Sequence, residues 1–134
     1  MRTRVKFCGL VRPEDVDRAV ALGVDAVGFV FYPKSPRALT AAEAVPLRRR
    51  LPSYVAAVGL FVNETAAGLA AIRDQVGLDV LQFHGDEDLT LCEAACGVGG
   101  GRPRYWRAVR MRGAADLLKS SVDHPSAEVL LLDT

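Results

Sequence analysis

Two residues that can carry protons stand at the ends of strand-like runs, far apart in the sequence. Cys8 ends a run that begins at residue 4, and Asp133 ends a run that begins at residue 128. In parallel barrels, catalytic groups come from the carboxyl ends of several strands, which gather at one rim. A thiolate can act as a general base and a protonated carboxyl as a general acid. The pair therefore predicts proton-transfer chemistry on one bound ligand.

The elements that must position these groups follow a repeating pattern. Six apolar or β-branched runs have the length of strands, and most are apolar throughout, which is typical of strands covered on both faces. The runs are 4–8, 26–31, 54–62, 79–83, 105–109 and 128–133. Helical patterns lie between them, with the spacing of the crossovers that make parallel sheets.

Helix ends are indicated by particular residue types. Gly23 and Gly77 follow apolar stripes and are predicted to end helices. Asn63 is predicted to cap the helix that precedes Gly77. Asp86–Asp88 places negative charge at the start of the next helix, and a weaker helical pattern covers 114–122.

Two segments give less direct signals. Thr40 and Glu43 form a capping-box sequence, whereas Pro46 would lie inside that helix. The helix is therefore expected either to start late, near Pro46, or to be kinked. The glycine-rich stretch 97–101 leads into a strand rather than a helix, so it is interpreted as a flexible turn and not as a phosphate-binding loop.

These patterns favour an α/β fold of the (β/α)8 barrel type. The first strand is followed by no Gly-x-Gly-x-x-Gly turn, which argues against a dinucleotide-binding sheet. Polar residues at several strand ends favour the barrel. We expect residues 1–134 to form one partial barrel domain of about six parallel strands and five helices, with strands seven and eight absent.

Composition narrows the function classes. The net charge is +1, with 50% hydrophobic and 25% charged residues, which favours neither nucleic acid nor an anionic membrane as a partner. No apolar stretch approaches the ~18 residues of a membrane span. Three cysteines and the absence of a signal-peptide pattern are expected of a cytoplasmic protein. Cys92 and Cys96 have no further ligands at suitable spacing, so no metal site is predicted.

Five segments, taken together, identify a family. In chain order they resemble the first, second, third, fourth and sixth strand regions of phosphoribosylanthranilate isomerase, a (β/α)8 enzyme of tryptophan biosynthesis. The segments are 6–10 (KFCGL), 25–37 (DAVGFVFYPKSPR), 58–63 (VGLFVN), 81–87 (LQFHGDE) and 130–134 (LLLDT).

The resemblance implies an Amadori rearrangement of a phosphorylated sugar, N-(5-phosphoribosyl)anthranilate, without metal or organic cofactor. It assigns the base to Cys8 and the acid to Asp133, which we expect to be partly buried so that it stays partly protonated. It assigns binding of the anthranilate carboxylate to Arg37, whose planar side chain suits that group.

Three further residues are candidates for the site. Lys6 lies two residues before Cys8, so strand alternation places it on the same side, where its charge favours the thiolate. Gln82 and His84 are candidates for contact with substrate. A core-filling role for Gln82 and a structural role for His84 stay open.

Length leaves two alternatives for function. A complete barrel takes at least ~200 residues, so we expect this chain to be a fragment whose open sheet edges promote self-association. The first alternative to an isomerase is an inactive barrel fragment that lacks the phosphate-binding loops. The second alternative is another ribulose-phosphate-binding barrel, such as a relative of indole-glycerol-phosphate synthase, although that chemistry uses lysine and glutamate at the strand ends.

Overall fold

The computed structural model describes residues 1–97 and 104–134. The described residues form six strands and five helices in strict alternation, as the sequence predicts. The strands are β1 (Lys6–Cys8), β2 (Ala26–Val30), β3 (Ala56–Phe61), β4 (Val80–Phe83), β5 (Tyr105–Arg110) and β6 (Val129–Asp133). The helices are α1 (Pro13–Ala21), α2 (Ala41–Arg48), α3 (Ala66–Val76), α4 (Leu89–Ala95) and α5 (Ala114–Asp123).

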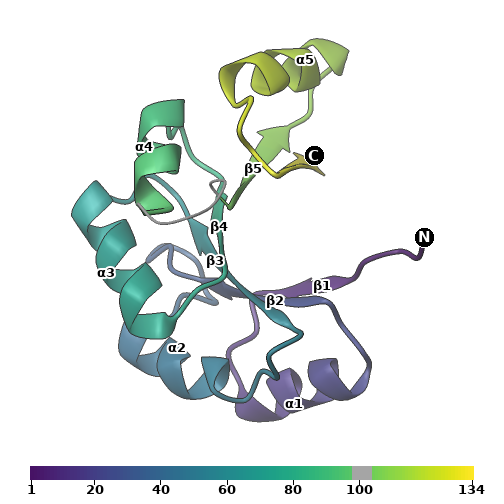
Figure 1. Ribbon diagram of the computed structural model, residues 1–134, viewed down its shortest axis with the longest axis vertical. Helices are drawn as coiled ribbons and strands as arrows, with labels where there is room; N and C mark the ends of the chain where they lie inside the picture. The colour runs from purple at the N-terminus through teal and green to yellow at the C-terminus, as the bar shows by residue number, and fades with distance from the viewer. Residues whose placement is uncertain (98–103) are drawn as a thin grey trace.

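The sheet is parallel and its strands follow chain order from β1 to β6. Each strand pairs with the next one along the chain, so every crossover joins nearest neighbours. Helices α1 to α4 lie on one side of the curved sheet, and both chain ends lie towards the opposite, open side (Figure 1). This arrangement is a partial (β/α) barrel, which confirms the predicted fold class.

The main core lies between the sheet and the helices, and it contains a row of aromatic rings. Phe31, Phe61, Phe83 and Tyr105 follow one another across the strands, with ring centroids 5.3, 6.3 and 5.9 Å apart. His124, just after α5, continues the row at 6.0 Å from Tyr105. A smaller cluster of Ala26, Val58 and Val80 covers the other, concave face. The sheet therefore has two differently built faces.

Two helix starts differ from the sequence-based expectation. Thr65, not Asn63, caps α3, and its hydroxyl accepts a hydrogen bond from Gly68 N at 3.1 Å. Asn63 adopts φ +52° instead and its Oδ1 accepts from Asp86 N at 2.7 Å. An asparagine in the left-handed region is common in loops, and here its side chain joins two loops rather than capping a helix.

Of the two alternatives expected for α2, the late start near Pro46 is wrong. The capping box of Thr40 and Glu43 is formed, and the helix begins at Ala41 and continues through Pro46. The glycine-rich stretch that was interpreted as a flexible turn lies, apart from Gly97, outside the described residues.

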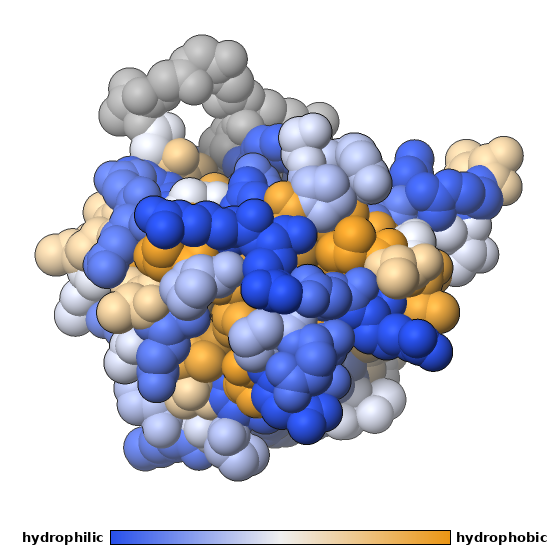
Figure 2. All heavy atoms as spheres, turned by 90° about the horizontal axis from the view of Figure 1, so that it is seen from below, coloured by the Kyte–Doolittle hydropathy of each residue, from blue (hydrophilic) through white to orange (hydrophobic). Residues whose placement is uncertain are grey.

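Exposed apolar side chains mark the two edge strands. Phe7 in β1 is 38% exposed and Leu132 in β6 is 60% exposed, while Leu118 and Val122 of α5 are also exposed. On the face seen from the side of α1 and α2, hydrophobic patches show between hydrophilic side chains (Figure 2). In residues 1–97 and 104–134 no helix is long and apolar enough to cross a membrane.

Candidate active site

Strand register places Cys8 and Asp133 on the same face of the sheet. Side chains alternate along a strand, so positions paired in register, or two residues apart, share a face. The series from one residue to the other is Cys8, Gly28, Val58, Val80, Gln82, Trp106, Ala108, Leu131 and Asp133. Because all strands are parallel, both residues also lie at the same rim. They stand on the two edge strands, β1 and β6, across the concave face.

Lys6 lies on the same side as Cys8, as expected. A Cβ atom added to Gly28, the register partner of Cys8, would lie 2.9 Å from Cys8 Sγ and 3.2 Å from Lys6 Cε. Both side chains therefore occupy the space above Gly28. The ammonium of Lys6 reaches across the concave face, where Nζ is 6.0 Å from the ring centroid of Trp106. The side chain of Lys6 thus passes beside the thiol.

Arg37 also approaches Cys8, from the loop after β2. Its Nη1 donates a hydrogen bond to the backbone oxygen of Cys8 at 3.2 Å. The guanidinium packs on Gly9, where an added Cβ would lie only 2.5 Å from Nη1, and Gly9 has φ +79°. Glycine is needed there both for the backbone conformation and for the close approach.

Gln82 and His84 meet at the carboxyl end of β4. Gln82 is 3% exposed, and its Nε2 lies 2.5 Å from His84 Nε2. The amide nitrogen donates, so this imidazole nitrogen accepts and the ring is neutral. Burial lowers the pKa of His84 below its usual value of 6.5. The Asp133 carboxylate raises this pKa, whereas the Lys6 and Arg107 cations lower it further. These charges therefore act on one another across the rim.

Asp133 differs from its expected environment. Its side chain is exposed rather than partly buried, because β6 is an edge strand and its neighbour on one side is β5 alone. Met111 N donates to the backbone oxygen of Asp133 at 2.7 Å, which fixes the position of the residue. Its register partner in β5 is Arg110. A second cation therefore stands next to the carboxylate on the same face.

A buried carboxylate that the sequence analysis did not assign joins the rim loops. The Glu87 side chain is 1% exposed and accepts from Gly85 N at 2.7 Å, from Asn63 N at 3.3 Å and from Arg107 Nη1 at 3.3 Å. Arg107 Nη2 also donates to Gly85 O at 2.5 Å. The loops after β3 and β4 are thus tied to β5 by one ion pair, directly beside His84.

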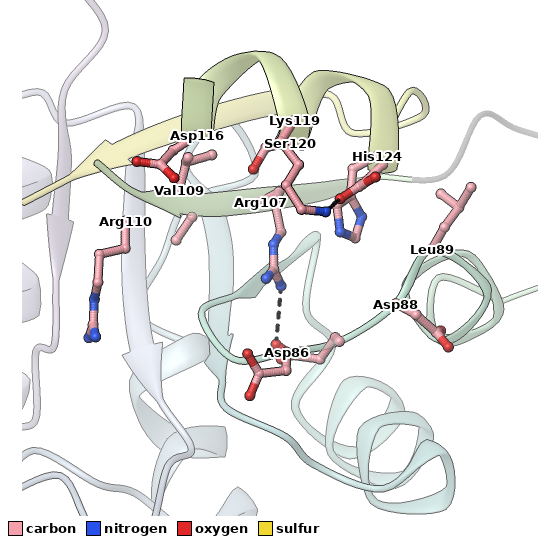
Figure 3. A pocket seen from close by; sticks show the side chains of 13 residues that line it. Asp86, Asp88, Leu89, Arg107, Val109, Arg110, Asp116, Lys119, Ser120 and His124 are labelled. Atoms are coloured by element: carbon pink, nitrogen blue, oxygen red, sulfur yellow. Dashed lines mark hydrogen bonds and ion pairs between the residues drawn. The ribbon is translucent and has the colours of Figure 1, made fainter. Parts of the chain in front are cut away.

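Two hollows adjoin this rim. One of about 410 Å³ is lined by residues that include Asn63, His84, Arg110 and Arg112. A second, of about 560 Å³, lies between α5, β5 and the loop before α4. In Figure 3 the Arg107 side chain extends from β5 towards that loop. Among the described residues no group of three or more histidine, cysteine or acidic side chains is placed to hold a metal.

Comparison with known proteins relates this chain to one family. Residues 5–133 match the family model of N-(5'-phosphoribosyl)anthranilate isomerase. The chain belongs to this family. Relatives that bear the same name are 54% identical in Methylibium petroleiphilum and 48% identical in Dechloromonas aromatica, each over 133 residues and 99% of this chain. These matches cover 60% and 61% of the two relatives.

Solved structures of the phosphoribosylanthranilate isomerase family agree in fold. The Thermotoga maritima enzyme superposes with a TM-score of 0.88 at 34% identity, over 99% of this chain and 63% of the other. A second structure, in complex with reduced 1-(o-carboxyphenylamino)-1-deoxyribulose 5-phosphate, gives a TM-score of 0.87 at 36% identity, over 99% of this chain and 66% of the other. The chain thus spans about three fifths of the length of its relatives.

Sequence patterns did not indicate that Glu87, Arg107 and Trp106 lie at this rim or on this face of the sheet. Glu87 was interpreted only as negative charge at the start of a helix. The residues that bury it, Asn63 and Arg107, are distant in sequence, so no local pattern indicated the network. One signal was available for Arg107, because a charged residue inside an otherwise apolar strand needs a partner when that strand is covered on both faces. For Trp106, the alternation of side chains along β5 indicated which residues share its face. The sequence did not show that Trp106 pairs with Gln82 of β4.

Proposed function

We propose that this chain carries the acid–base groups of a phosphoribosylanthranilate isomerase, acting as a single unit of residues 1–134. The substrate would be N-(5-phosphoribosyl)anthranilate and the reaction its rearrangement to 1-(2-carboxyphenylamino)-1-deoxyribulose 5-phosphate. One observation supports this most directly: Cys8 and Asp133 share a face and a rim, with Lys6, Arg37 and His84 between them or beside them.

The proposed roles follow from the chemistry of the rearrangement. Asp133 donates a proton to the ring oxygen as the anthranilate nitrogen forms a double bond to C1 and the C1–O bond breaks. Cys8, as thiolate, removes the proton from C2, and the electron pair of that C–H bond forms the C1=C2 bond of an enol while the C1=N electron pair returns to nitrogen. Protonation at C1, with loss of the proton of the C2 hydroxyl, gives the ketone. General acid and base catalysis each contribute about 10²- to 10⁴-fold in such steps.

The remaining site residues bind and orient. Lys6 brings a positive charge to the face of the sheet that carries the thiol. Arg37 has a planar guanidinium suited to the anthranilate carboxylate, and its contact with Cys8 O would place that group next to the base. Gln82 and His84 would meet the sugar from β4.

A turnover assay tests the proposal on this chain. Loss of phosphoribosylanthranilate fluorescence is followed for the unaltered chain and for Cys8→Ser, Asp133→Asn and Cys96→Ser. Cys96 is the matched control because it is a half-buried free thiol on the helix side. We expect turnover that falls at least about 100-fold in the first two variants only. An unaltered chain without turnover, or a Cys8→Ser variant at normal rate, contradicts the proposal.

We also propose that copies of the chain associate through the edges of the sheet. In the described residues β1 and β6 each pair on one side only, and apolar side chains are exposed beside both strands. Unpaired strand edges are templates for pairing with another chain.

A further inference from the structure

Two polar atoms on the concave face are buried and have no hydrogen-bond partner among the described residues: Gln82 Oε1 and Trp106 Nε1. Gln82 and Trp106 are register partners in β4 and β5, so they stand side by side. The amide nitrogen of Gln82 is already directed to His84, which leaves the oxygen free. Buried polar groups are almost always paired, so both atoms call for a partner that residues 1–97 and 104–134 do not supply.

The surroundings favour a ligand that enters from the concave side. The neighbouring positions carry small side chains, namely Ala26, Val58 and Val80, and Trp106 packs against this cluster. Gly28 has no side chain at all. The Lys6 ammonium lies above the indole at 6.0 Å, which holds the ring by a cation–π contact and leaves its N–H edge as the polar element.

The two atoms define the chemistry of the missing partner. Indole N–H can only donate, and an amide oxygen can only accept. A group that contacts both must accept from one and donate to the other, as a hydroxyl does. A carboxylate or phosphate fails this requirement, because it has no hydrogen to give to Gln82 Oε1. We propose that Trp106 and Gln82 together bind a hydroxyl group of the sugar, and that Trp106 is a substrate-positioning residue of this site. The inference rests on the function proposed above and names the residues that would recognise the sugar part of the substrate.

The indole resonance offers a direct test, because Trp106 is the single tryptophan of the sequence. Its Nε1–H gives one identifiable signal in a ¹⁵N–¹H spectrum. Ribulose 5-phosphate is titrated into the unaltered chain, and the ring signals of His84 are followed as an independent report of binding at the rim. We expect the indole signal to move downfield and to saturate together with the His84 signals.

A variant separates hydrogen bonding from packing. Trp106→Phe keeps an aromatic ring under Lys6 but removes the N–H donor. We expect it to weaken ribulose 5-phosphate about threefold to tenfold and to leave the affinity for anthranilate, which has no hydroxyl, unchanged. A purely structural role would weaken both ligands alike, and that result overturns the inference.

Two further outcomes distinguish this inference from the function on which it rests. If the His84 signals titrate while the indole signal stays in place, or if Trp106→Phe binds the sugar phosphate normally, the hydroxyl contact is wrong and the proposed function stands. If ribulose 5-phosphate moves no signal of the chain, both are overturned, since no sugar phosphate binds on this face.

Discussion

Arg37 donates a hydrogen bond from Nη1 to the backbone oxygen of Cys8 at 3.2 Å, and it reaches that oxygen across Gly9. The proposed carboxylate-binding residue and the proposed base are therefore linked through one peptide unit. A shift of the guanidinium moves the backbone of the residue that carries the thiol. Binding of the aromatic acid and placement of the base are thus expected to change together.

Gly9→Ala should disturb this link, and the chain contains a matched control. Gly9 and Gly23 have φ of +79° and +80°, but an added Cβ contacts Arg37 only at Gly9, and at Gly23 it meets nothing within 4 Å. Both variants should lose about 1–2 kcal/mol for the left-handed backbone. Gly9→Ala alone should also weaken anthranilate binding and alter the rate at which Cys8 reacts with a thiol reagent. Urea unfolding and calorimetric titration measure the two effects. Equal behaviour of both variants would contradict the link.

Glu87→Gln should cost far more stability than loss of an exposed ion pair. The buried carboxylate neutralises Arg107 and accepts from two loop amides. Removing one partner of a buried pair typically costs about 3–5 kcal/mol, because the other charge stays buried.

The control is Asp123→Asn, which breaks the exposed pair with Lys119 and should cost less than about 1 kcal/mol. Urea denaturation at neutral pH measures the free energy of unfolding of both variants. Similar losses in the two would show that the Glu87 network contributes little.

Acid should destabilise the fold before the carboxylates titrate. Burial lowers the pKa of both His84 and His124 below the usual 6.5. The unfolded chain therefore binds more protons than the folded chain between the lowered values and pH 6.5. Stability is thus expected to fall as the pH decreases through that window, and the contribution of these histidines to be constant above and below it.

Urea midpoints measured from pH 7.5 to 5 should decline as the pH falls, and the slope should decrease in His124→Gln. Tyr105 Oη lies 3.3 Å from His124 Nδ1, so the variant is also compared with the unaltered chain at pH 7.5, where the loss of that contact is measured alone. A midpoint that is constant from pH 7.5 to 5 would contradict burial of neutral histidines.

Association through the sheet edges should respond to charge at the edge strands. Phe7→Lys or Leu132→Lys places a charge on β1 or β6, where an approaching strand would have to bury it. Tyr54→Lys is the control, because Tyr54 is 82% exposed in the segment before β3, a strand that pairs on both sides. Sedimentation velocity should show concentration-dependent association that the edge variants reduce and the control does not. A monomer at all concentrations would refute the proposal.

Sequence periodicity predicted the architecture because its signals are local. Strand runs, helix stripes and the Thr40 capping box each depend on neighbours within a few residues, and all were found. Asn63 was misassigned because its side chain bonds to Asp86, in the next loop, instead of to its own helix. The burial of Asp133 was wrong because exposure at an edge depends on which strands are present, and no local pattern encodes that.

The candidate site divides in the same way. Cys8, Lys6 and Arg37 could be grouped from strand ends and alternation together with the family resemblance. Glu87 and Trp106 could not, since their importance arises from partners 20 or more residues away: Asn63 and Arg107 for Glu87, and Gln82 for Trp106. Which polar atoms are buried or lack a hydrogen-bond partner is known only from the three-dimensional arrangement of the strands and loops.

Strand parity, rather than any contact, brings Cys8 and Asp133 to the same face. One residue inserted in β1 before Cys8 would turn the thiol towards the helix-covered face of the sheet. Residues inserted in the loops between strands and helices would leave the thiol on the concave face. Substitutions would therefore change the rate of proton transfer by Cys8 and Asp133. Short insertions in the strands would decide whether these two side chains share a face at all. Sequence variation within the family should accordingly accept length changes between strands and exclude them within strands.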